Sequence, residues 1–457
     1  MRLVLLGGGG FRVPLVHRAL LDDEHAGRVD ELVLHDVDEG RLETMTRVLA
    51  QQGAGAPRPV TVRATARIDE ALEGADFIFS AIRVGGLSGR TLDERIALDH
   101  AVLGQETVGA GGISYGLRTV PVAVGIAERI AALAPNAWLI NFTNPAGLIT
   151  QAIQAVLGDR AIGICDSPVG LGRRAATALG FQGADVQLGY AGLNHLGWVD
   201  SLVINGVDRL PDLLADDAAL LSIEEGRLFG TEWIQSLAML PNEYLYYYYF
   251  TREAVAAIMG EPQTRGEFLL DQQTGFYQRA LAAPSSAYRQ WRSAWEDRET
   301  TYMREVRQPT VQRDARDFGG GYERVALALM AAIAHDEPAR LVLNVRNRGA
   351  VECLGVDAVV EVPCLVDAGG PVPQLSRISG GHERGLVQQV KAAEELTIEA
   401  ALTGSRRRAV QAFATHPLVD SVGVARDLFD AYAAAFPQLG AIFAAQPVPG
   451  SPSVAGH

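Results

Sequence analysis

Cys165 and His195 are the two residues whose side chains point most directly to a chemistry. Cys165 lies in the segment AIGICDSP, and His195 lies in GLNHLG. A thiolate and an imidazole together can bind a divalent transition metal. Both segments follow an N-terminal glycine-rich stretch, MRLVLLGGGG, which is typical of dinucleotide binding. A metal site beside a nicotinamide cofactor indicates redox chemistry at a carbon whose oxygen the metal holds.

The glycine run has the features of a turn that binds the pyrophosphate of NAD. It follows an apolar stretch that predicts a strand, and Pro14 stands where a helix would begin. Glycines allow close backbone approach, and a helix N-terminus favours phosphate groups. The spacing is not a strict G-x-G-x-x-G, so a glycine turn that binds nothing is the alternative. The residues concerned are Gly7, Gly8, Gly9 and Gly10.

Asp36 closes the next predicted strand, ELVLHD. A carboxylate at this position accepts hydrogen bonds from the adenosine ribose and repels a 2′-phosphate. The sequence therefore favours NAD over NADP.

The elements that must position these residues follow two patterns. Up to residue 184, short apolar runs alternate with helical stretches, which predicts an N-terminal Rossmann-like, doubly wound parallel sheet in the α/β class. The expected strands are 2–6, 31–35, 60–64, 75–82, 137–141 and 161–164, and 117–134 is an expected helix. From residue 185 to 445 we expect an α+β domain for catalysis, substrate binding and oligomerisation, which makes the overall fold lactate/malate dehydrogenase-like. Residues 446–457 are expected to form a flexible tail.

The second region begins with two expected antiparallel strands, 186–192 and 198–204, and a turn at Asn205 and Gly206. Helices are expected at 264–279, 322–334, 382–402 and 406–413. The charged, tryptophan-containing stretch 284–318 is expected to be a solvated helix.

Composition and charge exclude several classes of partner. The formal net charge of -14 argues against nucleic acid and anionic membranes, which attract basic surfaces. No apolar run reaches the roughly 20 residues that a spanning helix needs. Three cysteines give no disulfide framework and fit a reducing cytoplasm. A strand pattern that starts directly after Met1 does not indicate a signal peptide. We therefore expect a cytoplasmic protein.

Four further segments make the interpretation specific: IRVGGLSGRTLDERIALDH, LGQETVGAGGISYGLRTVPV, INFTNPAGLIT and LPNEYLYYYY. Together with GICDSP and GLNHLGW they resemble glycoside hydrolase family 4, over nearly the whole chain from GGGG to ATHPLVDS. This family comprises NAD- and divalent-metal-dependent enzymes, including 6-phospho-β-glucosidases and 6-phospho-α-glucosidases. The resemblance implies a homodimer or homotetramer that acts on a phosphorylated disaccharide or aryl glucoside.

The resemblance also implies roles for individual residues. Cys165 and His195 match the metal ligands, usually for Mn²⁺, and Tyr244 matches the catalytic base. Glu106 matches the acidic residue that raises the basicity of this tyrosine, and Asp166 matches the proton donor of the α-type enzymes. The matching substrate-binding residues are Arg90, Asn144 and Arg265, the last near the sugar phosphate.

The chemistry of the residues agrees with this assignment. Once NAD has taken hydride from C3 of the sugar, the C2 proton becomes acidic and a metal on O2 and O3 stabilises the enolate. A base then removes the C2 proton, the leaving group departs from C1, water adds, and NADH returns the hydride. Two-carboxylate glycosidases use no such steps.

Departures from the family pattern leave alternatives open. Many relatives have serine and threonine where this chain has Gly10 and Val13. The motif C-D-S-P matches neither the β-type C-N-V-P nor the α-type C-D-M-P. Asp166 favours an α-glucosidase, whereas NFTNPAGL and SYGLRTVPV favour a 6-phospho-β-glucosidase, which we take as the expected activity.

Several of these residues, and the function itself, also have alternative interpretations. Cys165 alone could be a buried apolar residue, His195 a structural histidine, and Tyr247 is the reserve candidate for the base. Arg83, Arg90, Arg118 and Arg265 could each be ordinary ion-pair partners. Cys353, Cys364 and His382 have no pattern of ligand spacing. An NAD-dependent hydroxy-acid dehydrogenase and a catalytically inactive sugar-phosphate sensor are the competing functions.

Overall fold

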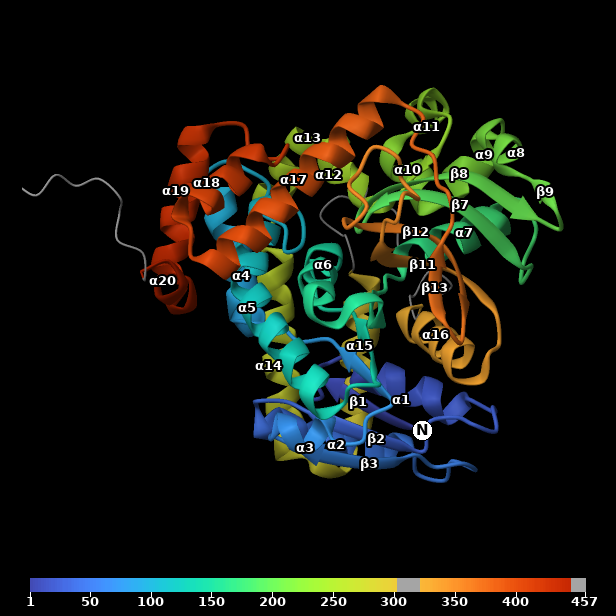
Figure 1. Cartoon of the computed structure of the whole chain (residues 1–457), viewed down its shortest axis with the longest axis vertical. Helices are drawn as coiled ribbons and strands as arrows, with labels where there is room; N and C mark the ends of the chain where they lie inside the picture. The colour runs from blue at the N-terminus through green and yellow to red at the C-terminus, as the bar shows by residue number, and fades with distance from the viewer. Residues whose placement is uncertain (302–320, 445–457) are drawn as a thin grey trace, which may run out of the picture.

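Six parallel strands form the N-terminal half of the sheet in the computed structural model, which describes residues 1–301 and 321–444. Their spatial order is β3-β2-β1-β4-β5-β6, the order of a doubly wound dinucleotide-binding fold. The strands are β1 (Arg2–Leu6), β2 (Glu31–His35), β3 (Thr61–Thr65), β4 (Phe77–Ser80), β5 (Trp138–Asn141) and β6 (Ala161–Gly163). Figure 1 shows β1, β2 and β3 at the bottom of the molecule. The expected Rossmann-like sheet is confirmed.

Helices cover both faces of this sheet because side chains alternate along each strand. In β1, Leu3 and Leu5 pack in the hydrophobic cluster on one face, and Val4 and Leu6 pack in the cluster on the other. The helices of this half are α1 (Val13–Asp22), α2 (Glu39–Gln52), α3 (Ile68–Leu72), α4 (Gly86–Asp99), α5 (Gly109–Leu133), α6 (Ala146–Leu157) and α7 (Ser167–Ala178).

Helix α5 begins eight residues before the expected position 117, in the stretch GAGGISYG. Glycines disfavour helix interiors, so this start was not expected. Here they are needed for close packing: a Cβ atom at Gly111 would lie 2.2 Å from the carbonyl oxygen of Gln105, and one at Gly112 would lie 2.5 Å from that of Thr107. The start of α5 therefore packs directly against the G-Q-E-T segment.

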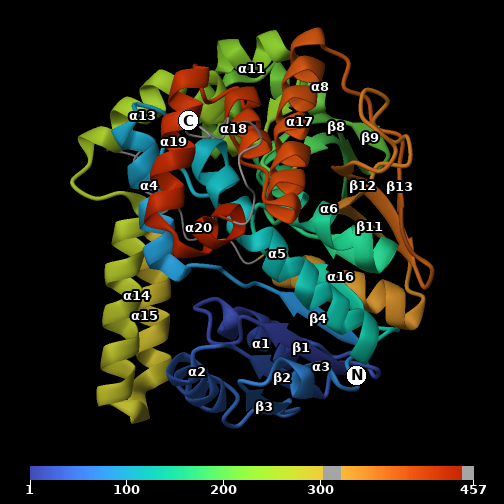
Figure 2. The ribbon, with the colours of Figure 1, turned by 60° about the vertical axis from the view of Figure 1, so that its left-hand side comes forward.

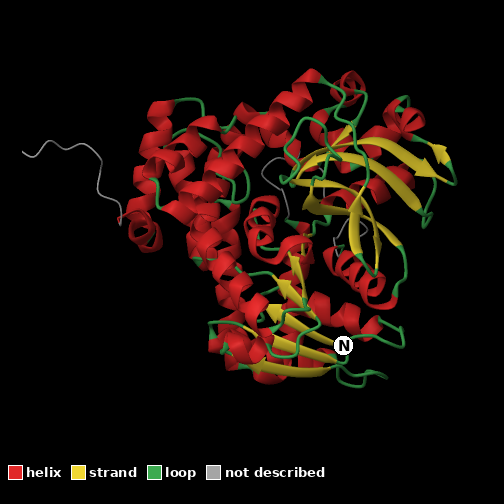
Figure 3. Ribbon diagram, in the orientation of Figure 1, coloured by secondary structure: helices red, strands yellow, loops and turns green. Residues whose placement is uncertain are grey.

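The strands after β6 pair antiparallel and continue the same sheet (Figure 3). They are β7 (Val186–Leu193), β8 (Leu196–Ile204), β9 (Val207–Asp208), β10 (Leu240–Pro241), β11 (Ala339–Arg346), β12 (Val359–Asp367) and β13 (Gly370–Pro373). The turn at Asn205 and Gly206 joins β8 to β9, with φ angles of 52° and 78°. The sheet is continuous across residue 184, so the division into two domains stays a prediction.

In Figures 1 and 2, most helices of the second half of the chain lie above the strands β1, β2 and β3. Two of them run down one side of the molecule as far as α2. Small helices follow β9 and β10: α8 (Leu210–Leu214), α9 (Asp217–Ser222), α10 (Glu224–Phe229), α11 (Thr231–Leu237), α12 (Tyr246–Tyr249) and α13 (Thr251–Gly260). The helices later in the chain are α14 (Arg265–Ala282), α15 (Ala287–Thr300), α16 (Tyr322–His335), α17 (Gly381–Thr403), α18 (Arg406–Thr415), α19 (Val422–Ala435) and α20 (Pro437–Ala444).

The expectation of a solvated helix is wrong for one face of α15. Trp291 is buried, and its indole N–H donates to the carbonyl oxygen of Phe11. The helix packs against α14 and α2, which Figure 2 shows at the lower left. The rest of the expected helix and the expected tail, 446–457, lie outside the described residues. Within the described residues, no helix has the length and apolarity needed to cross a membrane.

Candidate active site

A cavity of about 900 Å³ lies at the carboxyl ends of the parallel strands, where the second half of the chain covers the sheet. Ligands of open α/β sheets bind at this edge. Almost all of the expected site residues line this one cavity: Gly7, Gly10, Asp36, Arg90, Glu106, Asn144, Cys165, Asp166, His195, Tyr244 and Arg265. Gly8 and Gly9 do not line it, because they pack against β2 and Asp36.

The glycine turn after β1 is too tight for side chains. Gly7 has φ +87°, and a Cβ atom at Gly10 would lie 2.8 Å from the carbonyl oxygen of Gly7. In this conformation of the loop, the glycine at position 10 is a steric requirement. The Gly9 N–H donates to the Asp36 carboxylate at 2.8 Å, and so the turn and the acidic end of β2 are joined. This arrangement fits the pyrophosphate and ribose of a dinucleotide.

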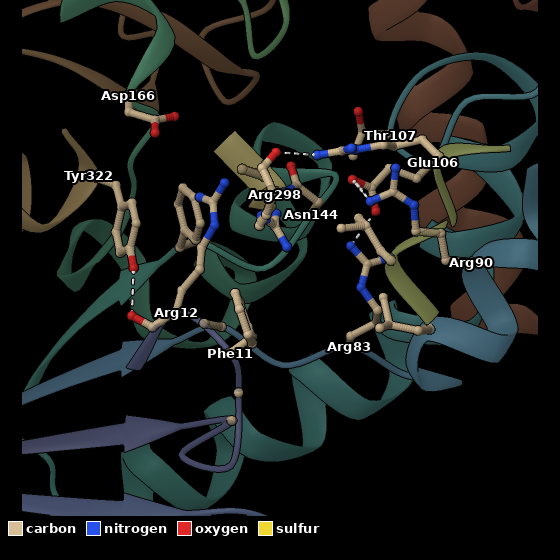
Figure 4. Close-up of a pocket in the computed structure, with 18 of the residues that line it drawn as sticks. Phe11, Arg12, Arg83, Arg90, Glu106, Thr107, Asn144, Asp166, Arg298 and Tyr322 are labelled. Carbon is tan, nitrogen blue, oxygen red and sulfur yellow. Dashed lines mark hydrogen bonds and ion pairs between the residues drawn. The ribbon is translucent and has the colours of Figure 1, made fainter. Parts of the chain in front are cut away.

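Glu106 lies between two arginines on the opposite wall of the cavity (Figure 4). Its carboxylate pairs with Arg83 and, at 2.7 Å, with Arg90, which also binds Glu94 at 2.8 Å. Burial alone would raise the pKa of Glu106, but Arg83 and Arg90 outweigh burial and lower this pKa to about 2. Glu106 is therefore a fixed negative charge, and Arg90 is held by carboxylates on two sides.

His195 occupies the two-residue turn between β7 and β8 in a left-handed conformation with φ 63°. Its Nδ1 atom lies 3.1 Å from the hydroxyl of Thr107. Its ring stacks on that of Tyr244, with the centroids 3.7 Å apart and the planes 2° from parallel. Tyr244 also interacts electrostatically with Arg90. The candidate metal ligand and the candidate base are thus in direct contact.

Cys165 and Asp166 form the loop between β6 and α7. Cys165 is buried, and burial, with Glu361 and Asp166 adding to it, raises the pKa of its thiol. Burial also lowers the pKa of His195 to about 4, which keeps the ring neutral as a metal ligand must be. No cluster of three or more ligand-type side chains exists among the described residues. The donor set, the Cys165 sulfur and the His195 imidazole, fits a metal that displaces the thiol proton on binding and completes its coordination with substrate and water oxygens.

Ser167 links this loop to the segment that carries Tyr244. Its hydroxyl donates to the Glu243 carboxylate at 2.7 Å, and both side chains are buried. Burial raises the pKa of Glu243. The serine of the C-D-S-P motif thus has a defined partner, Glu243, to which no pattern in the sequence points.

A buried carboxylate on β12 supports the turn that carries His195. Glu361 accepts hydrogen bonds from Asn344 at 2.8 Å, Tyr190 at 3.2 Å and Asn194 at 3.3 Å. Burial raises the pKa of Glu361 to about 7. Sequence reasoning missed this residue, because 167 positions separate it from Asn194 and no motif marks it.

Cations gather in the middle of the cavity. The Arg298 side chain, from the end of α15, lies close to that of Arg12. In Figure 4 both lie between Asp166 on one side and Glu106, with its paired arginines, on the other. Burial, followed by the charges of Arg12 and Arg265, lowers the pKa of Arg298 to about 9. Arg265 donates to the carbonyl oxygens of Arg298 and Thr301 at 2.8 and 3.1 Å. Arg265 was expected from the sequence, but neither Arg12 nor Arg298 was, because only the tertiary fold brings α15 to the glycine loop.

Comparisons with known proteins agree with this architecture. A model described as "Family 4 glycosyl hydrolase" matches residues 2–181, and one described as "Family 4 glycosyl hydrolase C-terminal domain" matches residues 190–419. A probable 6-phospho-beta-glucosidase of Bacillus subtilis is 31% identical over 440 residues, which cover 94% of this chain and 95% of that protein.

Solved structures give the same result. The 6-phospho-beta glucosidase of Thermotoga maritima with NAD and glucose-6-phosphate has a TM-score of 0.81 at 26% identity, covering 96% of this chain and 99% of that one. A 6-phospho-alpha-glucosidase from gut microorganisms with NAD and Mn²⁺ has a TM-score of 0.79 at 25% identity, covering 95% and 97%. A malate dehydrogenase of Plasmodium falciparum has a TM-score of 0.51 at 13% identity, covering 88% and 98%, which confirms the expected dehydrogenase-like fold.

Proposed function

Because this chain belongs to the family 4 glycosyl hydrolases, we propose that it hydrolyses 6-phospho-β-glucosides with the help of NAD and a divalent metal such as Mn²⁺. One observation carries the proposal: Tyr244 stacks on His195 in the same cavity that the NAD-type glycine turn lines. The relatives named for 6-phosphoglucosidase activity support the substrate class, and those solved with NAD and Mn²⁺ support the cofactors.

When bound, NAD would accept and later return the hydride of C3, and the metal would polarise the O2 and O3 atoms. Cys165 and His195 would hold the metal. Tyr244 would remove the C2 proton, which becomes acidic beside a C3 ketone. The positive charge of Arg90 next to Tyr244 favours the deprotonated phenol, and Glu106 holds Arg90 in place. Asp166, which lies across the cavity from Arg90 and Glu106 in Figure 4, would donate a proton to the departing glycosidic oxygen.

The sugar phosphate would bind among the arginines in the middle of the cavity. Arg90 is already engaged by Glu94 and Glu106, and Arg265 by two backbone carbonyl groups. We therefore add Arg298 and Arg12 to the expected set of Arg90, Arg265 and Asn144. The crowding of cations around Arg298 supports this assignment, because a phosphate dianion would relieve their mutual repulsion.

The proposed β preference rests on the NFTNPAGL and SYGLRTVPV segments and on the β-type relatives; 6-phospho-α-glucosides are the alternative substrate. A turnover assay with p-nitrophenyl 6-phospho-β- and 6-phospho-α-glucoside, plus NAD and Mn²⁺, tests both. We expect the β-anomer to react faster without net NADH formation. Net NADH release would instead indicate a dehydrogenase, and nucleotide and sugar-phosphate binding without turnover would indicate a sensor.

Three further properties are part of the proposal: the location, the range of substrates and the oligomeric state. A thiolate metal ligand requires reducing conditions, which supports a cytoplasmic location. Phosphorylated disaccharides and aryl glucosides are both proposed substrates. We also expect a homodimer or homotetramer, which light scattering of the purified protein would measure.

A further inference from the structure

The hydroxyl of Thr107 has two neighbours that compete for one proton. Its Oγ1 atom lies 3.0 Å from Oε1 of Gln105 and 3.1 Å from Nδ1 of His195. A hydroxyl has one hydrogen to donate and lone pairs that accept. Which neighbour receives the hydrogen therefore determines where the proton of the imidazole ring lies.

Backbone hydrogen bonds identify the Gln105 atom as the oxygen. The N–H groups of Thr107 and Val108 both donate to it, at 2.6 and 3.0 Å. An amide oxygen only accepts, so the Thr107 hydroxyl donates to Gln105. Its lone pair is then directed to His195 and accepts from an N–H at Nδ1. The opposite arrangement would leave two acceptors, Oγ1 and Oε1, facing each other at 3.0 Å without a hydrogen.

We propose that Thr107 and Gln105 are positioning residues that keep the proton of His195 on Nδ1, so that Nε2 carries the lone pair for a divalent metal. The inference rests on the proposed metal-binding role of His195. A ligand histidine uses one nitrogen for the metal and is oriented through the other. Stacking on Tyr244 fixes the plane of the ring, and the Thr107 contact fixes its rotation within that plane. Figure 4 shows Thr107 next to Glu106. Two adjacent residues of one short segment therefore contact the proposed metal ligand His195 and the guanidinium of Arg90.

The decisive experiment measures the ¹⁵N chemical shifts of the His195 ring in the metal-free, full-length protein at neutral pH. A His195→Ala spectrum identifies the signals among the nine histidines. We expect the Nδ1–H tautomer in the unmodified protein and a shift toward Nε2–H in Thr107→Val, which keeps the side-chain shape but lacks the hydroxyl. Thr107→Ser should restore the original tautomer. An Nε2–H tautomer in the unmodified protein would overturn the inference without any variant.

Mn²⁺ affinity, measured by titration calorimetry, gives a second measurement that does not depend on turnover. Loss of such a supporting contact typically weakens metal binding about 10- to 100-fold, so Thr107→Val should bind Mn²⁺ that much more weakly and Thr107→Ser like the parent protein. Thr119→Val is the matched control: it lies on α5, and its buried hydroxyl has no partner among the described residues. Unchanged Mn²⁺ affinity in Thr107→Val would contradict the inference, provided that His195→Ala does weaken binding. Unchanged affinity in His195→Ala would instead contradict the proposed metal site itself.

Discussion

The ring of Tyr244 lies parallel to that of His195, with the centroids 3.7 Å apart. The two residues come from different elements, the segment after β10 and the turn between β7 and β8. Their contact places the proposed base next to a proposed metal ligand. In an elimination at C2 the base and the metal act on adjacent atoms of the same sugar ring, so this proximity is what the proposed reaction needs.

Replacement of Tyr244 by phenylalanine separates these two roles. The Tyr244→Phe variant keeps the ring that stacks on His195 but has no proton acceptor. We expect kcat to fall about 10²–10⁴-fold, as for the loss of other general bases, with little change in the Kd for Mn²⁺ or NAD. Calorimetry and steady-state kinetics measure these quantities. A variant with nearly full activity would exclude Tyr244 as the base and make Tyr247 the next candidate.

We expect the activity to require a divalent metal that Cys165 binds. Chelator should inactivate the enzyme reversibly, and Mn²⁺ should restore activity best under reducing conditions, because thiolate oxidation removes a ligand. Cys165→Ser should weaken Mn²⁺ binding. Cys353→Ser serves as the control, since this half-buried cysteine lies outside the cavity. Full activity of Cys165→Ser in the presence of chelator would contradict the assignment.

Arg298 should determine the preference for phosphorylated substrates. Charge-assisted contacts to an anion contribute about 1.5–3 kcal/mol, so Arg298→Ala should lower kcat/KM for the 6-phosphoglucoside roughly ten- to a hundredfold. The plain glucoside should be affected little. Arg292→Ala is a matched control on the same helix, because Arg292 is exposed and, among the described residues, forms an ion pair with Glu296 alone. An equal loss for both substrates would show that Arg298 does not contact the phosphate.

Glu106 should make the stability of the protein depend on pH in the acid range. Its pKa is lowered from an ordinary value of 4.5 to about 2 in the folded protein, despite burial, by Arg83 and Arg90. A lowered pKa stabilises the folded state above the unfolded value, and this contribution disappears as the pH falls through the folded value. The contribution is about 3 kcal/mol at pH 7 and roughly half of that near pH 3.

Urea unfolding of the parent protein and of Glu106→Gln at pH 7, 5 and 3 tests this expectation. The difference in unfolding free energy should be largest at pH 7 and should shrink below pH 5. A difference that stays constant over this range would show that Glu106 contributes by packing and not by charge.

The parallel half of the fold could be predicted because buried parallel strands are continuous apolar runs, and β1 and β2 were located to the residue. The start of α5 could not, since its glycines serve contacts with residues 105 and 107 that only the tertiary structure creates. Short motifs that follow one another along the chain identified the residues around the site, including Cys165, His195 and Tyr244. Their partners from distant elements had no such signal. Only folding brings Glu361 on β12 to the turn that carries His195, and only folding brings Arg298 on α15 to the wall of the cavity.

Breakage of the C2–H bond is the most direct test of the central proposal. Two-carboxylate glycosidases leave this bond intact, whereas the proposed reaction breaks it in every turnover, with Tyr244 as the base. The product formed in heavy water from a p-nitrophenyl 6-phospho-β-glucoside, with NAD and Mn²⁺, can be analysed by NMR. We predict deuterium at C2 and the original hydrogen at C3, and a parallel loss of turnover and C2 exchange in Tyr244→Phe. Product from active enzyme with no deuterium at C2 would contradict the proposed mechanism.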